Sequence, residues 1–323
     1  MAENPLITTP FEGSSTAEEV ISGVDLRGLR AVVTGASSGL GAETARILAI
    51  AGADVTLAVR DTSAGARVAE HIACAGVRSL PVVAGIDLAD PGSVACFARA
   101  WAGPLHLLVN NAGLVTAGLD RTAQGWERQF ATNHLGHFAL AYSLHEALAQ
   151  GAADRGAARI VSVSSTAHMR SAIDFDDIHF EHRAYDPQIA YAQSKTANSL
   201  FAVEATRQWA TERIVANAVN PGGIRTGLQR NFTPLQRESL DAAEAAGVFT
   251  YKTVGQGAAT TLVAAISPEF ETTGGHYLDD CREAYTVDND ADLAAHSHGV
   301  KKWALDPDAA RELWSVSCAT LGM

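Results

Sequence analysis

Residues 31–41 read AVVTGASSGLG, a short apolar run that passes directly into a glycine-rich turn. A helical pattern follows the turn, with its apolar face at Leu40, Thr44, Ile47, Leu48 and Ala51. Glycine lets the backbone turn tightly and lets a ligand approach it, and the helix N-terminus adds unpaired N–H groups and a positive dipole. This strand–turn–helix unit therefore predicts a pyrophosphate site at Gly35, Gly39 and Gly41. The alternative is a turn that binds nothing.

Apolar runs alternate with helical patterns along most of the chain. We expect strands at 31–34, 55–59, 80–84, 105–109, 159–164, 214–220 and 275–278. We expect helices at about 40–51, 63–75, 92–101, 123–149, 188–212 and 255–266. Short apolar strands that alternate with helices are typical of βαβ units. The pattern therefore predicts the α/β class, with one doubly wound parallel sheet of the Rossmann type and helices on both faces.

No linker, composition break or internal repeat divides the sequence, so we expect one domain at 28–323. Residues 1–27 form a polar lead-in that we expect to pack on this domain, and overlapping capping boxes at 15–19 predict a short helix. Two segments, 167–187 and 227–254, interrupt the alternation. Ligands of open α/β sheets bind beyond the carboxyl ends of the strands, so we expect these loops to shape a substrate pocket.

Composition narrows the classes of partner. The 323 residues include 24 basic and 36 acidic side chains, a net charge of -12 that argues against nucleic-acid or anionic-membrane binding. No apolar run approaches the ~20 residues of a membrane helix, and the N-terminus lacks a secretory pattern. The four cysteines lack C-x-x-C spacing, which favours free thiols over disulfides or zinc. We expect a cytoplasmic protein without a membrane anchor.

Residues 191–195, YAQSK, place a tyrosine and a lysine four positions apart in a stretch that we expect to be helical. At this spacing both side chains leave the same face of a helix. A nearby ammonium favours the phenolate and lowers its pKa from the ordinary value of about 10. Tyr191 with Lys195 is therefore a candidate general acid/base for the proton of a hydroxyl group. The alternative is an exposed face of an amphipathic helix.

The glycine spacing is G-x-x-x-G-x-G and differs from the common G-x-G-x-x-G. Together with Asn110-Asn111-Ala112-Gly113 and Tyr191-x-x-x-Lys195, it resembles the short-chain dehydrogenase/reductase family. Further matches follow in the same order, at Asp87, Asn133, Ser165 and the turn Pro221-Gly222-Gly223-Ile224-Arg225-Thr226. The resemblance covers about residues 15–320.

Three segments are similar to one branch of that family, the retinol dehydrogenases and WW-domain oxidoreductases. They are the stretch 133–138 (NHLGHF), the 25-residue spacer between Ser165 and Tyr191, and the stretch 194–198 (SKTAN). Residues 11–25 resemble plant chloroplast-envelope members of the same branch. Animal members often carry a membrane anchor, which we do not expect here.

The resemblance implies four catalytic residues. Tyr191 would protonate a carbonyl oxygen in reduction or take a hydroxyl proton in oxidation, and Lys195 would lower its pKa and bind the nicotinamide ribose. Ser165 would hydrogen-bond the substrate oxygen. Asn133 would hold a water that links Lys195 to solvent. The alternatives are a turn-capping role for Ser165 and an exposed helix face for Asn133.

The resemblance also implies the residues that contact a nicotinamide dinucleotide, among them Tyr191 and Lys195. In the glycine-rich turn they are Gly35, Ser37, Ser38, Gly39, Leu40 and Gly41. On the adenosine side they are Asp87, Leu88, Asn111, Ala112 and Gly113. At the nicotinamide carboxamide they are Pro221, Gly222, Ile224 and Thr226.

Cofactor choice depends on the end of the second expected strand. An acidic residue there binds the ribose 2′-hydroxyl of NAD, whereas an arginine accommodates the 2′-phosphate of NADP. Val59 takes the place of the family's NAD-type aspartate, and Arg60 follows it. Guanidinium matches phosphate in geometry and charge, so NADP(H) is favoured. Use of NAD(H) is left open, because Asp61 is adjacent and because Arg60 could alternatively be a surface residue without a role in binding.

We therefore expect an NADP(H)-dependent oxidoreductase that transfers hydride between nicotinamide and a carbonyl or secondary alcohol of a small organic substrate. The alternatives are an NAD-dependent alcohol dehydrogenase and a catalytically silent dinucleotide-binding sensor or scaffold. Dehydratases and epimerases of the extended type resemble G-x-x-G-x-x-G instead. The substrate, and assembly with identical chains, are left open by the sequence.

Histidines recur in pairs, at 134 and 137, 179 and 182, and 296 and 298. No carboxylate or cysteine spacing completes a ligand set around them, so we expect no metal site. His168 stands three residues after Ser165, and we expect it to be an exposed loop residue rather than part of the pocket.

Overall fold

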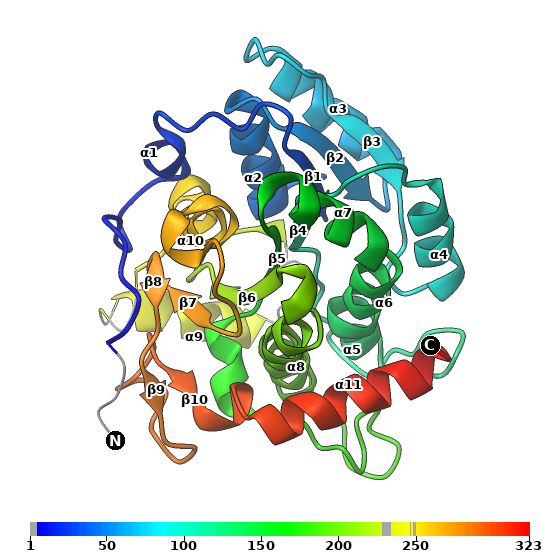
Figure 1. The fold of residues 1–323 in the computed structure, drawn as a ribbon. Coiled ribbons are helices and arrows are strands. Elements are labelled where there is room, and N and C mark those ends of the chain that lie inside the picture. Colours follow the sequence, from blue (N-terminus) through cyan, green and yellow to red (C-terminus); the bar gives the residue numbers. More distant parts are fainter. Residues whose placement is uncertain (1–4, 228–233, 246, 248–249) are drawn as a thin grey trace.

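The computed structural model of the chain describes residues 5–227, 234–245, 247 and 250–323. Its centre is an eight-stranded sheet in the order β3-β2-β1-β4-β5-β6-β7-β8, flanked by helices on both faces (Figure 1). The strands are β1 (Arg30–Thr34), β2 (Asp54–Val59), β3 (Val82–Gly85), β4 (Leu107–Asn110), β5 (Ala158–Val163), β6 (Ile214–Asn220), β7 (Tyr277–Asp279) and β8 (Arg282–Glu283). The first seven pair in parallel, and β8 returns antiparallel to β7. The doubly wound α/β prediction is confirmed.

Helices cover both faces of the sheet. Successive strand residues point to opposite faces, so both sets of side chains are buried. Ala31 and Val33 pack in the same core as α1 (Ala17–Ile21), α2 (Gly39–Ile50), α3 (Thr62–Ala73) and α10 (Val254–Ile266). Val32, between them, packs in the core of α4 (Pro91–Ala100), α6 (Gly136–Ser143), α7 (His145–Arg155) and α8 (Pro187–Gln208). Continuous apolar strands are thus explained by helices on both sides.

The stretch 123–149, expected to be one helix, is divided in the structure. Helical turns begin only at α5 (Arg128–Phe130), because the buried Glu127 carboxylate caps the chain by accepting from the N–H groups of Gln129 and Phe130. A π turn, η1 (Ala131–Leu135), follows and leads into α6 and α7. Apolar periodicity alone does not reveal this wider turn.

The C-terminal elements were missed by the sequence analysis. A parallel pair, β9 (Thr286–Val287) and β10 (Val300–Lys301), precedes α11 (Pro307–Leu321), and α9 (Pro234–Ala245) lies in the segment expected to be a loop. Helix α11 packs on α8 (Figure 1). In this contact the Trp314 ring stacks on Phe201, with the ring centres 6.2 Å apart. The short 3₁₀ turns are η2 (Thr166–Arg170), η3 (Ala210–Glu212), η5 (Pro268–Phe270) and η6 (Lys302–Ala304).

The N-terminal lead-in packs on the sheet domain over its described part. Thr16 and Glu19 form a capping box at the start of α1, so the short helix predicted there is confirmed. Helix α1 packs on α10 and α2, and Ile7 exchanges two backbone-anchored hydrogen bonds with Glu283. Among the described residues, no helix combines the length and the apolar character needed to cross a bilayer.

Candidate active site

The glycine-rich turn after β1 is locked against the segment that follows β4. Gly35 has φ +66°, and a Cβ built on it would lie 2.8 Å from the Cα of Ala112. A Cβ on Gly41 would lie 2.4 Å from Nδ2 of Asn111. Both distances are too short for real carbon atoms, so any side chain at these positions would displace the neighbouring segment. The structure thus brings residues 35–41 and 111–113 together, as the sequence predicts.

Thr34, the last residue of β1, fixes the same junction. Its Oγ1 accepts from the backbone N–H groups of Asn111 at 2.9 Å and Ala112 at 3.0 Å. The Asn111 side chain donates in return to the Thr34 carbonyl at 2.8 Å. The backbone beside the predicted adenosine position is therefore held by side chains of both strand ends.

The N-terminus of α2 faces this turn and suits an anion. Within the described residues, Ser38 at the N-cap makes no side-chain bond to the helix, and the first turn carries no acidic residue. The N–H groups of Gly39, Leu40 and Gly41 precede the first intrahelical bond, which runs from Ala42 N–H to the Ser38 carbonyl. Such free N–H groups and the helix dipole favour a phosphate.

Arg60 and Asp61, the two residues that could determine cofactor choice, differ in their contacts at the end of β2. Arg60 is exposed. Asp61 is the N-cap of α3, and its Oδ1 accepts from the Ala64 N–H at 2.9 Å. The carboxylate offered as the ribose ligand of NAD is therefore engaged in capping a helix.

Asp87 and Leu88, predicted to contact adenine, lie in the turn that follows β3. Asp87 Oδ1 accepts from the Ala89 N–H at 2.9 Å, which forms a tight turn after β3. The Leu88 carbonyl packs so closely on α6 that a Cβ at Gly136 would lie 2.2 Å from its oxygen. A surface hollow of about 410 Å³ adjoins this turn, lined in part by Asp87 and Arg128.

Tyr191 and Lys195 lie one turn apart on α8, as their spacing predicts. The Lys195 Nζ is 5.6 Å from the centre of the Tyr191 ring and donates to the Val163 carbonyl at 2.8 Å. The Tyr191 side chain hydrogen-bonds Ser165 at the end of β5. The structure therefore brings the tyrosine, the lysine and the serine together, although α8 and β5 are separated by the segment 167–187.

Burial governs the ionisation of this pair. It raises the pKa of Tyr191 to about 12, against the opposing effect of the Ser165 hydrogen bond. It lowers the pKa of Lys195 to about 8. The pKa of Tyr191 is therefore raised and not lowered as expected, because loss of hydration outweighs the Ser165 hydrogen bond. Near pH 7 the phenol therefore keeps its proton and the amine is charged.

Asn133 is buried in the π turn, so the alternative of an exposed helix face is wrong. Its Oδ1 accepts from the Leu114 N–H at 2.9 Å, and its Nδ2 donates to Ser194 Oγ at 3.0 Å. A Cβ built on Gly113 would lie 3.4 Å from Asn133 Oδ1 and 3.6 Å from Lys195 Nζ. The amide and the ammonium thus flank the same glycine.

Asn220, at the end of β6, was missed by the sequence analysis. Its Oδ1 accepts from the backbone N–H groups of Thr166 and Gly222, both at 3.2 Å. Its Nδ2 donates to Thr166 Oγ1 at 2.8 Å. One buried amide therefore joins the turn that contains Ser165 to the turn 221–226. Its place directly before Pro221 was the available signal.

His168 was expected to be exposed, and that prediction is wrong. Its side chain is fully buried, because β7 and β10 cover the turn 165–170, which we call the serine turn. His168 Nδ1 lies 2.8 Å from the Ser165 carbonyl, and its Nε2 accepts from the Lys301 N–H at 3.3 Å. Burial lowers the pKa of His168 to about 4. Ser165 itself also caps the serine turn, since its Oγ accepts from the Ala167 N–H at 3.2 Å.

The turn 221–226 packs beside the glycine-rich turn. Thr226 Cγ2 lies 3.6 Å from a Cβ built on Gly39, and Ile224 lies against Gly257 of α10. Lys252 donates its backbone N–H to the Gly223 carbonyl at 2.8 Å. The segment expected at the pyrophosphate and the segment expected at the nicotinamide carboxamide therefore meet at the N-terminus of α2.

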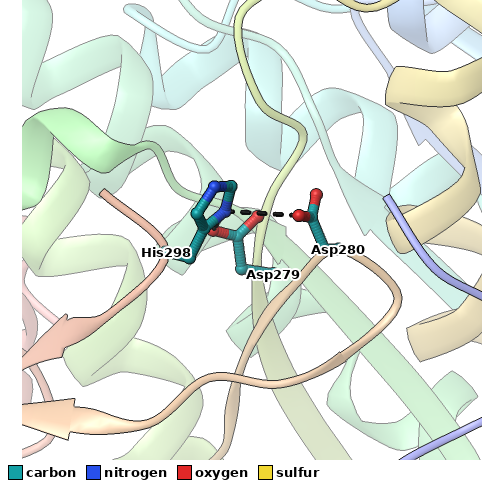
Figure 2. A group of neighbouring side chains, drawn as sticks. All are labelled: Asp279, Asp280 and His298. Carbon is teal, nitrogen blue, oxygen red and sulfur yellow. Dashed lines mark hydrogen bonds and ion pairs between the residues drawn. The ribbon is translucent and has the colours of Figure 1, made fainter. Parts of the chain in front are cut away.

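Asp279, Asp280 and His298 lie close together, with their polar atoms directed toward one another (Figure 2). His298 Nδ1 lies 3.1 Å from Asp279 and 3.3 Å from Asp280. These atom types can hold a metal, and the sequence analysis did not foresee the group. Lys252 pairs with Asp280, and His298 hydrogen-bonds Asp279, which raises the pKa of His298, so each carboxylate already has a nitrogen partner. The group is an ion-pair cluster.

Comparisons with known proteins agree with this geometry. A family model described as short chain dehydrogenase matches residues 30–236. The chain is 48% identical over 296 residues to a protein named "Probable oxidoreductase" from Streptomyces antibioticus, covering 90% of this chain and 97% of the relative. It is 36% identical over 313 residues to human retinol dehydrogenase 12, covering 93% of this chain and 88% of the relative. The crystal structure of an uncharacterized protein from Mycobacterium paratuberculosis superposes with a TM-score of 0.71 at 30% identity, over 96% of this chain and 98% of the other.

Proposed function

The chain belongs to the short-chain dehydrogenase/reductase family, in its retinol dehydrogenase-like branch, and on this premise we propose that it is an NADP(H)-dependent oxidoreductase. It would transfer hydride between nicotinamide and a carbonyl or secondary alcohol of a small organic substrate. The observation that carries the proposal is the convergence of Tyr191, Ser165 and Lys195 at the carboxyl ends of the strands.

A carbonyl reduction needs a hydride for the carbonyl carbon and a proton for the carbonyl oxygen. The nicotinamide, when bound, supplies hydride to the carbonyl carbon. Tyr191, protonated near pH 7, donates its proton to the carbonyl oxygen, and Ser165 hydrogen-bonds the same oxygen as negative charge develops on it. The phenolate left behind is stabilised by the Lys195 ammonium, and oxidation of an alcohol runs through the same groups in reverse.

A dinucleotide fits the remaining residues. The α2 N-terminus would hold the pyrophosphate, and the glycines at 35 and 41 keep the backbone free of side chains there. Asn133, next to Lys195 at Gly113, would hold the water that exchanges protons with solvent. The domain 28–323 would carry the whole site, with the loops 167–187 and 227–254 around the substrate.

The preference for NADP(H) rests on Arg60. It is exposed at the end of β2, where the 2′-substituent of the adenosine ribose is expected, whereas the Asp61 carboxylate caps α3. An NAD-dependent dehydrogenase remains the competing proposal, and in it Asp61 would have to leave its cap. The name of the human relative supports an alcohol or aldehyde as the substrate class.

The test is to measure dissociation constants for NADPH and NADH, then NADPH oxidation with a panel of ketones, aldehydes and quinones, and NADP⁺ reduction with secondary alcohols. We expect tighter binding of NADPH and turnover of at least one substrate. Cofactor binding without any turnover would favour the silent sensor or scaffold. Tighter binding of NADH would overturn the assignment of Arg60.

A further inference from the structure

A buried side chain of the serine turn, His168, contacts the C-terminal part of the chain. We propose that His168 is a positioning residue, which fixes Ser165 against β7 and β10 and thereby sets where Ser165 meets the substrate oxygen. This inference rests on the proposed function of the same site. It extends the site to residues beyond 236, outside the segment that the family model matches.

Hydrogen-bond partners define the state of the imidazole. The Ser165 carbonyl, 2.8 Å from Nδ1, can only accept, so Nδ1 carries a hydrogen. The Lys301 N–H, 3.3 Å from Nε2, can only donate, so Nε2 is without one. A single neutral tautomer satisfies both contacts. Because the ring bridges two backbone groups with opposite demands, it fixes their separation.

Two further groups from the C-terminal segment hold the same turn. The Tyr277 hydroxyl lies 3.1 Å from His168 Nδ1, and the two rings are 4.8 Å apart. The Trp303 indole N–H donates to the His168 carbonyl at 3.2 Å. The turn is therefore held from β7, β10 and η6, and the imidazole is the part that reaches Ser165.

This arrangement has a catalytic consequence. Ser165 Oγ must lie within hydrogen-bond distance of a substrate oxygen, and small displacements of a positioned group reduce turnover steeply. Loss of the Nδ1 donor would leave the Ser165 carbonyl with the His168 backbone N–H at 3.0 Å and without its link through the ring to β10, which would let the turn shift. Most of the predicted cofactor contacts lie in the turns after β1, β3 and β4, so the dissociation constant of NADPH should change little even though Asn220 links the serine turn to the turn 221–226.

Two substitutions separate the two ends of the imidazole. In His168→Asn, the amide nitrogen can take the place of Nδ1 and keep the bond to Ser165. In His168→Gln, the longer side chain can reach the Lys301 N–H but no longer presents a donor at the δ position. The matched control is His106→Gln. His106 is also buried, accepts from the Arg30 N–H at 2.9 Å, and lies at the amino ends of β1 and β4, away from the site.

The readouts are kcat and KM for a carbonyl substrate, the dissociation constant of NADPH, and Tm. For His168→Gln we expect kcat to fall about 10- to 100-fold with NADPH affinity unchanged. For His168→Asn we expect kcat within about threefold of the wild type, although Tm falls in both variants. His106→Gln should lower Tm without lowering kcat.

Equal losses of kcat in the two His168 variants, or losses that follow Tm across all three variants, would overturn the positioning role. A wild type that turns over no carbonyl or alcohol would instead overturn the proposed function, and this inference with it. If His168→Gln does not fold, Trp303→Phe offers a second test, with an expected loss in kcat of about threefold and unchanged NADPH affinity. An unchanged kcat there would contradict the proposal.

Discussion

The turn after β1 and the inner face of α8 lie at the same edge of the sheet but are built in opposite ways. The turn depends on glycines, which carry no side chain, and a Cβ added to Gly41 would lie only 2.4 Å from Asn111 Nδ2. The α8 face is made of buried polar groups, such as Lys195, whose ammonium bonds the Val163 carbonyl. We therefore expect the turn after β1 to be disrupted when an atom is added, and the α8 face to be disrupted when a polar atom is removed. Substitutions that subtract single groups therefore test the second region hardest.

The largest expected effect comes from removing one oxygen atom on α8. Tyr191→Phe should lower kcat by about 100- to 10,000-fold, because the proton donor is lost while the ring remains. The dissociation constant of NADPH should stay near that of the wild type. Initial-rate kinetics with a carbonyl substrate and a binding titration measure the two quantities. Near-wild-type turnover would show that another group supplies the proton.

The next effect concerns the charge on the same helix face. Because burial lowers the pKa of Lys195 to about 8, NADPH should bind more weakly as pH rises through 8 and the ammonium is lost. In Lys195→Met this pH dependence should disappear, and both kcat and NADPH affinity should fall. Binding titrations between pH 7 and about 9.5 test this. The same apparent pKa in both proteins would exclude Lys195 as its source.

The free energy of unfolding should also depend on the ionisation of Lys195, and the direction of its change with pH follows from the pKa of that residue. The folded pKa of about 8 lies below the ordinary lysine value of 10.5, so the unfolded chain binds more protons between these pH values. The wild type should therefore gain stability as pH rises from about 8 toward 10, on the order of 1.4 kcal/mol per pH unit at most. Tyr191 opposes this only above pH 10, because burial raises its pKa. Denaturant unfolding of Lys195→Met should lack this gain.

A smaller effect is expected in the nucleotide region, at the end of β2. Arg60→Ala should weaken NADPH by about 10- to 100-fold, the worth of one charge-assisted hydrogen bond. NADH lacks the 2′-phosphate and should be affected much less. Dissociation constants of both cofactors for both proteins decide the point. Equal weakening would mean that Arg60 supports the turn and does not bind the phosphate.

The smallest effect should follow from the neighbouring carboxylate. Asp61→Ala removes the N-cap of α3 and should reduce the free energy of unfolding by about 1 kcal/mol. NADH affinity should change by less than about twofold, because the carboxylate is engaged with the helix. Urea unfolding and an NADH titration give the two values. A loss of NADH affinity beyond about tenfold would make Asp61 a ribose ligand.

Local motifs accounted for the sheet and for the turn at 35–41, because those elements depend on short-range periodicity and on glycine. The long-range contacts that hold the serine turn could not be predicted in the same way. His168 meets Lys301 across 133 positions and Tyr277 across 109, and no spacing rule relates such pairs. Asn220 likewise reaches Thr166 across 54 positions.

Other misses had signals in the chain. Helix α11 begins at Asp306-Pro307, an N-cap with proline in the first turn, which is a recognisable start. The late start of α5 depends on Glu127, a residue type that rarely caps and that is recognised here only by its buried contacts. The expected exposure of His168 failed because β10, one of the two strands that cover it, was not predicted, although a strand was expected at 275–278, where β7 lies.

The contact between His168 and Lys301 has a consequence for biosynthesis. A polypeptide leaves the ribosome from its N-terminus, and contacts between distant positions form slowly. The turns after β1 and β4 are complete within the first 113 residues, whereas the backbone group that closes on His168 arrives only at position 301. A nascent chain can thus build the turns proposed to bind the nucleotide well before the serine turn is held in place.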